Sequence, residues 1–410
     1  MVILHFNIYN LKINDLKKNK SFLIVHRYFY PENISAFANI LGYLSKYFLN
    51  LNDKNKVDIV TISSKKFQRD LFNGYEERIK IIEDFSQSDR SGSFFLRIRN
   101  IFRLFFKSYA QINKKKYDYI ILTSYPPFLP LMILFFLKER KSKIIFYVQD
   151  IQINYFKHKF LNNILLLSIK NILNSVDFVI TLSEDMKETL IGIEKKFSRK
   201  NIFVLNNFTN VARNDVQTKS IKKKYDLIYA GSLGVQQQLL AFIKFFKDFI
   251  KTYPSTKFII YGEGTEKKII NDFIVNQNLE NNIFLRNYIP KSELQKELHS
   301  SKFVLVSIKS DIFNYAYPSK IIDSLTNGFP VIVTAKKDSK ISSFINEHCL
   351  GSSIDINSDN IVDELDILRN LISESKNFSN KDIQTFASKK FGKDKYLDKF
   401  NEIFLQISKS

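Results

Sequence analysis

The sequence predicts an α/β protein with two doubly wound parallel sheets, one in each half of the chain. Short apolar runs, long enough for buried strands, alternate with segments of helical periodicity. A polar segment at residues 209–224 lacks apolar periodicity and separates two such series. A chain of 410 residues is also longer than a domain with one hydrophobic core usually is, and its length suits two domains. We therefore expect two Rossmann-like domains that face each other across a cleft.

In the first half, the apolar runs that predict strands are separated by enough chain for crossover helices. The runs are residues 22–25, 57–62, 117–123, 143–148, 176–182 and 201–205. Between the first two runs, apolar residues over 34–48 recur at the spacing of an amphipathic helix. Because parallel strands end at one edge of their sheet, the loops after these runs form the expected ligand-binding edge.

The second half repeats this alternation. Strands are expected at residues 227–230, 257–261, 282–285, 303–308 and 330–334, with helices at 239–250 and 266–276. The expected domains are therefore residues 1–210 and 211–389. A last helix within 390–410 could pack back onto the first domain through an apolar face made of Tyr396, Phe400, Ile403, Phe404 and Ile407.

A short helix is expected to begin near Pro318 and to end before residues 328–330. Proline suits a first helical turn, and the Gly-Phe-Pro sequence at 328–330 suits a helix end. The free amides of the first turn, the hydroxyl of Ser319 and the ammonium of Lys320 together favour phosphate binding. A plain surface helix with a solvated Asp323 explains the same residues.

Glycine-rich loops follow two of the expected strands in the second half. They occupy residues 231–234 and 262–264, and the loop 311–320 leads into the short helix. Glycine lets the backbone approach a ligand closely, and a turn from a strand into a helix is the usual phosphate cradle. The recurrence of such loops at one sheet edge favours a phosphate-containing ligand there.

The composition limits the classes of partner. With one cysteine and five scattered histidines, the sequence predicts neither a disulfide framework nor a metal site, and no cofactor is expected. The formal net charge of +21 favours an anionic partner. Nucleic acid is not expected, because the sequence has no zinc-ligand spacing, arginine-glycine tract or ribonucleoprotein motif.

An anionic membrane surface is the other candidate partner. Residues 94–109 mix large apolar residues with four cations, Arg97, Arg99, Arg103 and Lys107. This mixture suits either an interfacial helix or a core helix with extended arginines. The apolar stretch 120–137 contains three prolines, so we expect strand, loop and helix rather than a membrane span. No signal peptide is expected, and the predicted location is the cytoplasm, peripheral at the inner face of the plasma membrane.

A series of short motifs occurs in order along the chain. They are Tyr-Pro-Glu at 30–32, Ser-Tyr-Pro-Pro at 124–127, Val-Gln-Asp at 148–150, Thr-Leu-Ser at 181–183, Val-Leu-Asn-Asn-Phe at 204–208, Tyr-Ala-Gly-Ser-Leu-Gly at 229–234, Gly-Glu-Gly at 262–264, and Tyr-Pro-Ser-Lys at 317–320 with Asp323 and Gly-Phe-Pro at 328–330. From Phe22 onward the chain thus resembles the family 4 glycosyltransferases of GT-B fold that build bacterial surface polysaccharides. The resemblance implies that the first domain binds an acceptor and the second a nucleotide-sugar.

The resemblance also implies roles for individual residues. The implied donor site comprises Gly231, Ser232, Gly234, Gln237, Gly262, Glu263, Tyr315, Pro318, Ser319, Lys320 and Asp323. Asp323 stands where the family usually has a ribose-binding glutamate, and Tyr315 replaces the first glutamate of the same pattern. The basic pair that often follows the Gly231 loop is missing. We infer that Lys320 and helix amides stabilise the leaving diphosphate instead.

On the acceptor side, the resemblance places Asp150 at the cleft as a general base or hydroxyl-positioning group, and a helix-capping role is the alternative. Tyr30, Glu32 and Asn33 are the expected acceptor-binding residues. The expected reaction is a retaining hexosyl transfer from a UDP-sugar to a saccharide or lipid-linked acceptor, for capsule or O-antigen. A nucleotide-sugar epimerase of the same fold, and a basic nucleic-acid-binding or scaffold protein without catalysis, are the alternatives.

Overall fold

The computed structural model describes residues 19–31, 36–63, 65–86, 94–137, 141–153, 159–195, 197, 199–209 and 223–410. The chain forms two compact units. The N-terminal unit comprises Met1–Phe208, Asn314–Tyr317 and Lys393–Ser410, and the C-terminal unit comprises Thr209–Phe313 and Pro318–Gly392. The expected acceptor residues Glu32 and Asn33 and most of the expected linker lie outside the described residues.

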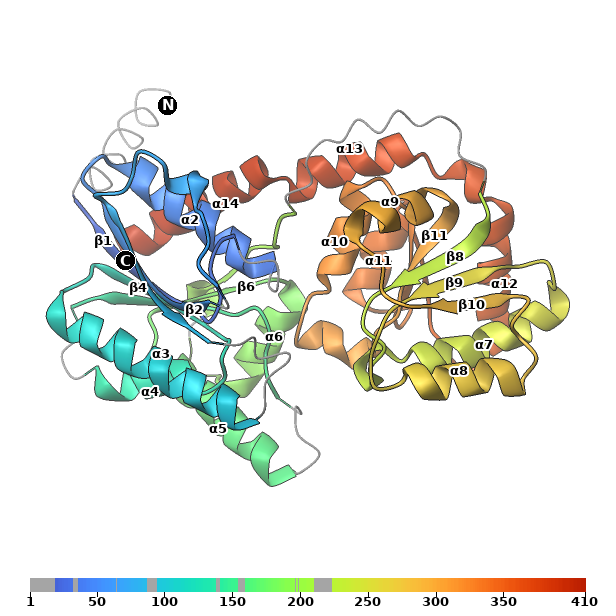
Figure 1. Ribbon diagram of the computed structural model, residues 1–410, viewed down its shortest axis with the longest axis horizontal. Helices are drawn as coiled ribbons and strands as arrows, with labels where there is room; N and C mark the ends of the chain where they lie inside the picture. Colours follow the sequence, from blue (N-terminus) through green and yellow to red (C-terminus); the bar gives the residue numbers. More distant parts are fainter. Residues whose placement is uncertain are drawn as a thin grey trace. The chain divides into compact units, whose positions relative to one another are not determined.

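The N-terminal unit is built on a seven-stranded parallel sheet with strand order β3-β2-β1-β4-β5-β6-β7 (Figure 1). The strands are β1 Ser21–Val25, β2 Lys56–Ser63, β3 Ile79–Phe85, β4 Tyr119–Thr123, β5 Lys143–Tyr147, β6 Phe178–Thr181 and β7 Ile202–Val204. The helices are α2 Ala36–Leu51, α3 Phe94–Lys114, α4 Leu129–Phe136, α5 Lys159–Leu173, α6 Glu184–Ile193 and α14 Lys393–Lys409. The strand order reverses between β1 and β4, which is where such sheets bind ligands.

Helices cover both faces of this sheet, so its inner strands, such as β1, β4 and β5, are largely apolar. Helices α2 and α14 lie on one side of the sheet, and α3 and α4 lie on the other (Figure 1). Phe22 of β1 stacks on Phe48 of α2 with ring centres 4.1 Å apart, and Phe48 also contacts Phe404 of α14 at 5.3 Å. A strand buried on both faces needs a continuous apolar run, which is why the sequence predicts these strands well.

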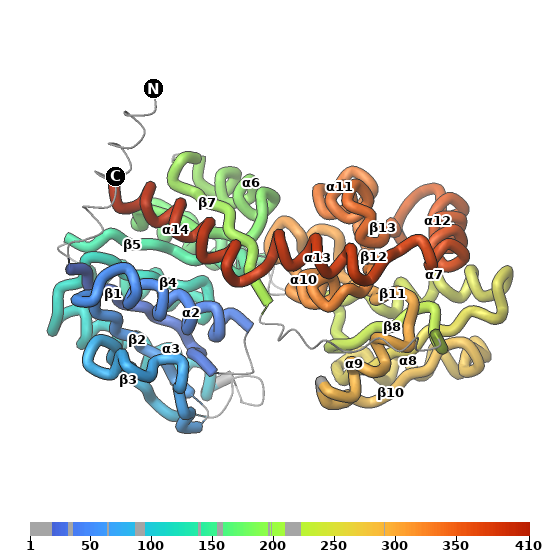
Figure 2. The backbone as a smooth tube through the Cα atoms, turned by 90° about the horizontal axis from the view of Figure 1, so that it is seen from above, coloured from blue at the N-terminus to red at the C-terminus, as the bar shows by residue number. Residues whose placement is uncertain are grey.

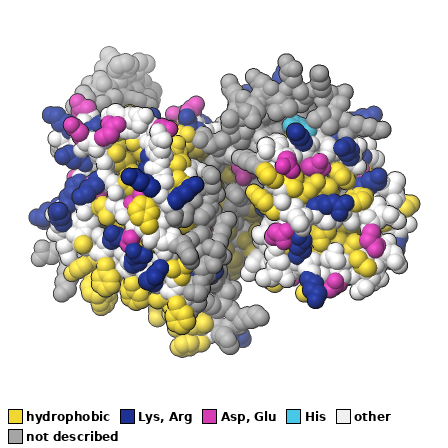
Figure 3. Space-filling model, in the orientation of Figure 1, with side chains coloured by type: hydrophobic (Ala, Val, Ile, Leu, Met, Phe, Trp, Pro, Cys, Tyr) yellow, Lys and Arg dark blue, Asp and Glu magenta, His cyan; other side chains and the backbone are white. Residues whose placement is uncertain are grey.

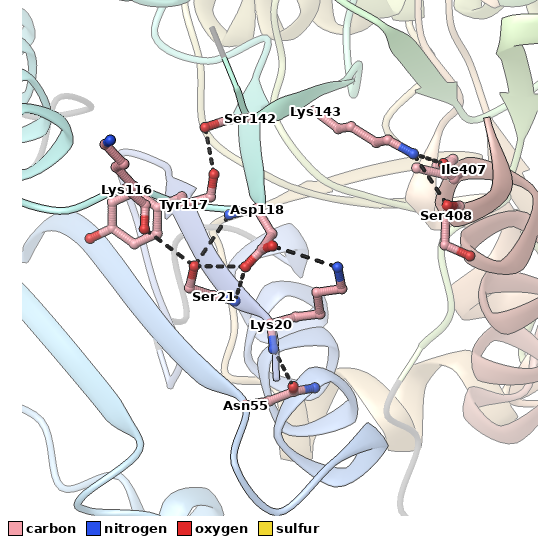
Figure 4. Close-up of polar contacts among 10 residues, drawn as sticks. All are labelled: Lys20, Ser21, Asn55, Lys116, Tyr117, Asp118, Ser142, Lys143, Ile407 and Ser408. Carbon is pink, nitrogen blue, oxygen red and sulfur yellow. Dashed lines mark hydrogen bonds and ion pairs between the residues drawn. The ribbon is translucent and has the colours of Figure 1, made fainter. Parts of the chain in front are cut away.

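Helix α14 belongs to the N-terminal unit although it ends the chain. Figure 2 shows it running along this unit, and its expected apolar face, from Tyr396 to Ile407, is buried there. The ammonium of Lys143, at the start of β5, donates to the carbonyls of Ile407 and Ser408 at 2.9 and 3.2 Å (Figure 4). These carbonyls lie in the last turn of α14 and have no partner within the helix, so the lysine fixes the helix end.

The C-terminal unit is built on a six-stranded parallel sheet with strand order β10-β9-β8-β11-β12-β13. The strands are β8 Tyr225–Ala230, β9 Phe258–Tyr261, β10 Ile283–Arg286, β11 Ser301–Val306, β12 Val331–Thr334 and β13 Gly351–Ile354. The helices are α7 Leu239–Thr252, α8 Lys267–Asn276, α9 Lys291–His299, α10 Ser319–Thr326, α11 Lys340–Glu347, α12 Ile361–Ser373 and α13 Asn380–Phe391. In order of appearance along the chain, this is the Rossmann order 3-2-1-4-5-6, with its switch point between β8 and β11.

Several details differ from the sequence predictions. Strands β3 and β13 were not expected, because β3 is only half-buried at a sheet edge and β13 reads Gly-Ser-Ser-Ile. Helix α10 begins at Ser319, so Pro318 is its N-cap rather than its first residue. The segment Asn314–Tyr317 packs with the N-terminal unit, whereas the expected boundary placed it in the second domain.

The apolar stretch 120–137 forms β4, a loop and α4, as the prolines predict. Among the described residues, no helix combines the length and the apolar character that crossing a membrane requires.

Candidate functional site

The expected donor residues of the C-terminal unit gather at the carboxyl edge of its sheet. The loops after β8 and β9 carry the glycines, and the loop after β11 leads through a 3-10 turn into α10. The edge between β8 and β11 is the switch point of this sheet. In a sheet of Rossmann order, helices on opposite faces leave a crevice at this point.

The two glycine loops are locked to each other. The amide of Gly231 donates to the carbonyl of Tyr261 at 2.9 Å, and the amide of Leu233 donates to the carbonyl of Glu263 at 2.8 Å. A Cβ atom on Gly262 would lie 2.0 Å from the carbonyl oxygen of Gly231. Gly262 is therefore required for contact between the loops.

Further hydrogen bonds shape the β8 loop and tie it to the segment that follows β11. The loop contains a 3-10 turn, η3 Val235–Gln237, whose Gln237 carbonyl accepts from the hydroxyl of Ser307 at 2.6 Å. The side-chain oxygen of Gln237 accepts from the amide of Gly234 at 3.2 Å. The Gln237 oxygen therefore shapes the loop, and the sequence pattern did not predict this role.

Lys320 is the central charged group of this edge. Its ammonium donates to the hydroxyl of Tyr229 at 3.5 Å and lies 4.7 Å from the centre of the Tyr229 ring. It also lies against the backbone of Gly231, because a Cβ atom there would be 1.7 Å from Lys320 Nζ. No carboxylate of the described residues pairs with this ammonium, and burial lowers its pKa to about 8.

The remaining expected donor residues lie at the rim of this edge. Ser319 and Asp323 are exposed on α10, and Asp323 is three residues beyond Lys320. Residues at this spacing lie on neighbouring parts of one helix surface. Ser232 is exposed, and the exposed Glu263 forms an ion pair with Lys267 at 2.6 Å.

Tyr229 is a site residue that the sequence analysis missed. It lies within β8, where an aromatic residue in an apolar run predicts only core packing. Its buried ring faces the Lys320 ammonium, and its hydroxyl donates to the carbonyl of Ser232 at 2.7 Å. An aromatic face attracts a cation, so Tyr229 holds the ammonium in place of a carboxylate.

Tyr315 does not join this group, because it lies in the N-terminal unit. Its carbonyl accepts from the amide of Ile151 at 2.7 Å, and the next residue, Ala316, forms an antiparallel bridge with Asp150. The chain returns to the C-terminal unit at Pro318. The replacement of a glutamate by Tyr315 is thus accompanied by packing against the loop that carries Asp150.

Asp150 follows β5 at the carboxyl edge of the N-terminal sheet. The hydroxyl of Ser124, which follows β4, accepts from the amides of Gln149 and Asp150 at 3.0 and 3.3 Å. The surrounding protein desolvates the Asp150 carboxyl and raises its pKa to about 6. Asp150 is nevertheless exposed in the free protein, which leaves the carboxylate open to a ligand.

Tyr30 and His26 lie near the start of the same edge. The carbonyl of Tyr30 accepts from Arg69 Nε at 2.8 Å, and its half-buried ring contacts Tyr43 and Phe72. His26 was not predicted as a site residue, since a lone histidine after an apolar strand carries no pattern. It is buried, its Nδ1 lies 2.7 Å from the Thr123 hydroxyl, and burial lowers its pKa to about 3. We assign no function to the His26 ring.

In the described part of the chain, no three His, Cys, Asp or Glu side chains form a group that could hold a metal ion.

The C-terminal unit also matches a known family. Residues 211–385 match the family model described as glycosyl transferases group 1. Over these residues the chain is similar to the group 1 glycosyltransferases. The resemblance that the motifs predict is thus confirmed over these residues.

A curated relative is similar to part of the chain. An uncharacterized glycosyltransferase of Methanocaldococcus jannaschii is 25% identical over 204 residues, which is 48% of this chain and 49% of that protein. The chain spans about half or less of the length of the curated relatives it matches.

The apo form of the lipopolysaccharide outer core galactosyltransferase WaaB matches 94% of this chain and 99% of its own, with a TM-score of 0.64 and 14% identity. Anabaena HepE in complex with UDP and glucose matches 94% and 99%, with a TM-score of 0.62 and 12% identity. At such identity the likeness shows the fold, and it confirms the GT-B architecture.

Proposed function

We propose that the protein transfers a sugar from a UDP-sugar to a saccharide or lipid-linked acceptor during the synthesis of a surface polysaccharide such as capsule or O-antigen. The observation that carries this proposal is the Lys320 ammonium, which is desolvated at the switch point of a group 1 glycosyltransferase domain and has no carboxylate partner among the described residues. A buried charge of this kind is stabilised by an anionic ligand. The diphosphate of a nucleotide-sugar is such a ligand.

The chemistry follows from the charge that develops during transfer. When the bond between the sugar and the diphosphate breaks, negative charge accumulates on the leaving phosphate oxygen. A positioned ammonium stabilises this charge more in the transition state than in the bound substrate, and so it raises the rate. The exposed Ser319 hydroxyl and the first amides of α10 can donate to the same phosphate groups.

Asp150 is proposed to act on the acceptor. With a pKa near 6, its carboxyl is ionised at neutral pH but is a stronger base than an ordinary aspartate. It can therefore accept a hydrogen bond from the attacking hydroxyl and orient it. We propose that the configuration at the anomeric carbon is retained, as in the family that the motifs resemble. Tyr30 remains the proposed acceptor contact among the described residues.

The donor and the pathway are inferred from the named relatives. UDP is proposed as the nucleotide because HepE binds UDP together with glucose. A surface polysaccharide is proposed because WaaB is a lipopolysaccharide galactosyltransferase. Since such acceptors are often attached to lipid, we also propose that the protein works at the inner face of the plasma membrane.

Titration with UDP at physiological salt, followed by calorimetry, tests the donor site. UDP binding that is lost in Lys320→Ala supports the proposal, and the anomeric proton signals of the product then report retention or inversion. Conversion of a UDP-sugar to its epimer without an acceptor would favour the epimerase alternative, which the family match already disfavours. Tight, salt-sensitive RNA binding without UDP binding would favour the scaffold alternative.

A further inference from the structure

Three helices of the N-terminal unit, α3, α4 and α5, expose a large apolar surface. Helix α3 contacts α4, and α4 contacts α5, so the three lie side by side. They carry most of the large apolar side chains that are exposed in the described residues: Phe95, Phe102, Phe106, Tyr109, Phe135, Phe136, Phe160, Leu161, Ile164, Leu166 and Leu167. We call this set the α3–α5 face. Figure 3 shows hydrophobic side chains gathered along the lower edge of the N-terminal unit, where Figure 1 places these helices.

The exposure of these side chains is high, and they form a continuous surface. Phe95 is 81% exposed, Phe135 is 79% exposed and Phe160 is 73% exposed. Phe136 links α4 to α3, because its ring centre lies 5.4 Å from that of Phe105 and 5.7 Å from that of Tyr109. Leaving a phenylalanine in water rather than burying it costs about 2 kcal/mol, so a patch of this size indicates a binding surface.

The exposed aromatic residues of helix α3 lie on one side of the helix. Phe95, Phe102 and Tyr109 are seven residues apart, and Phe106 lies between the last two on the same side of the helix. The opposite side of α3 buries Leu104 against the sheet. The helix therefore uses one apolar side for folding and has a second, exposed one.

The charge on these helices is of one sign. The sequences of α3, α4 and α5 contain no Asp or Glu, although they include Arg97, Arg99, Arg103, Lys107, Lys114, Lys159 and Lys170. Two of the four cations that the sequence predicts for membrane binding are paired with a carboxylate. Arg103 and Lys107 pair with Asp84 of β3 at 2.7 and 3.9 Å, which draws them to that strand. Arg99, Lys114 and Lys159 have no carboxylate partner among the described residues.

From this combination we infer that the α3–α5 face docks on an anionic lipid bilayer. Aromatic and aliphatic side chains enter the boundary between headgroups and acyl chains, while Arg99, Lys114 and Lys159 contact lipid phosphates. A second protein with an apolar surface would not account for the complete absence of acidic residues from three neighbouring helices. This inference rests on the proposed function, in which the acceptor is attached to lipid, and it names the surface that would meet the membrane.

Helix α5 connects this face with the proposed acceptor residue. Its exposed side carries Phe160 and Leu167, and its buried side contributes Leu165 and Ile169 to a small apolar cavity of about 30 Å³ that Asp150 also lines. Both features belong to the N-terminal unit. Docking through α5 therefore brings the Asp150 loop to the surface from which a lipid-linked hydroxyl would arrive.

The test is flotation of the full-length protein with vesicles of phosphatidylcholine, alone or mixed with phosphatidylglycerol. We expect binding to the anionic vesicles that weakens as salt is added. The variant Phe135→Ser/Phe160→Ser/Leu167→Ser should reduce it by roughly a thousandfold, because each apolar side chain contributes about tenfold. The variant Arg99→Gln/Lys114→Gln/Lys159→Gln should lose roughly a hundredfold, and only on anionic vesicles.

The matched control is Ile269→Ser/Val275→Ser/Val362→Ser, which removes exposed apolar side chains of the C-terminal unit. It should leave flotation unchanged. Circular dichroism melting of each variant confirms that the fold is retained. If the α3–α5 triple variant floats like the original protein, the inference is wrong. A second result would also overturn the inference. The original protein would form a dimer in sedimentation equilibrium and not bind vesicles, and the α3–α5 triple variant would be a monomer.

UDP calorimetry without vesicles separates this inference from the proposed function. The α3–α5 variants should retain full UDP affinity, because Lys320 lies in the other unit. If the original protein floats with anionic vesicles but does not bind UDP, the docking surface stands and the proposed function fails. If it binds UDP but does not float, the proposed function stands and the docking surface fails.

Discussion

Replacing Lys320 by methionine should increase the stability of the C-terminal unit while it weakens UDP binding. Burial lowers the pKa of the Lys320 ammonium from its ordinary 10.5 to about 8. One unit of pKa corresponds to about 1.4 kcal/mol, so holding the charge in the free protein costs roughly 2 to 3 kcal/mol once the remaining exposure is considered. Methionine keeps the length of the side chain without its charge. The melting temperature of this unit should therefore rise by roughly 5 °C.

The same substitution should weaken UDP binding by about 10- to 100-fold, because a hydrogen bond to a charged group contributes about 1.5 to 3 kcal/mol. The pH dependence gives a second signature. Below about pH 8 the ammonium is protonated in the free protein and ready for the diphosphate. Above it, UDP binding must take up a proton, so affinity should fall by up to about tenfold for each pH unit. Lys320→Met should show no such decrease.

Stability should change with pH in the opposite sense. Between about pH 8 and pH 10.5 the unfolded chain holds the Lys320 proton more firmly than the folded protein, so folding stability gains from rising pH in this window. Urea denaturation of the original protein and of Lys320→Met at both ends of the window measures this gain. Lys251→Met, at an exposed ion pair on α7, is the matched control. A less stable Lys320→Met that still binds UDP would refute the reasoning.

Three further predictions concern other residues at the carboxyl edges of the two sheets. Asp323→Asn should raise the Kd for UDP with little change in kcat, whereas Asp323→Glu should bind normally, because a carboxylate at this exposed position is proposed to accept from ribose hydroxyls; calorimetry decides. The kcat/KM should fall as the pH drops below about 6, where the Asp150 carboxylate is protonated, and Asp150→Asn should remove this limb of the pH profile. Gly262→Ala should destabilise the C-terminal unit by roughly 2 kcal/mol or more in urea titrations, since the new Cβ would meet a backbone oxygen, while Gly192→Ala in open space should not.

The sequence predicts the architecture well because both sheets are parallel and covered on both sides. Their inner strands must be continuous apolar runs, and those runs are easily recognised. Strand β3 escapes recognition because it is an edge strand that is only half-buried, and β13 escapes because three of its four residues are glycine or serine. Edge positions relax the requirement for apolar residues that the prediction depends on.

The site is predicted less completely, since its chemistry depends on contacts between distant residues. Lys320 can be identified from its place at a helix start, but not its lack of a carboxylate partner or its contact with the ring of Tyr229. Likewise, Arg103 and Lys107 suit a membrane surface in the sequence, whereas the fold pairs both with Asp84. Whether a cation is neutralised depends on tertiary structure, which spacing along one helix does not reveal.

Two features of this protein oppose its own stability or solubility when no ligand is bound. The Lys320 ammonium is desolvated without a carboxylate partner among the described residues, and the α3–α5 face exposes aromatic rings to water. Neither feature helps to fold the unit that carries it, and positions that break a local rule in this way are typical of functional sites. Under the two proposals above, both are relieved by the same class of partner, an organic phosphate: the diphosphate of a nucleotide-sugar in one unit and phospholipid in the other. An enzyme that joins a water-soluble donor to a lipid-linked acceptor, as we propose, needs both, and both partners are anions that suit the strongly basic composition of the chain.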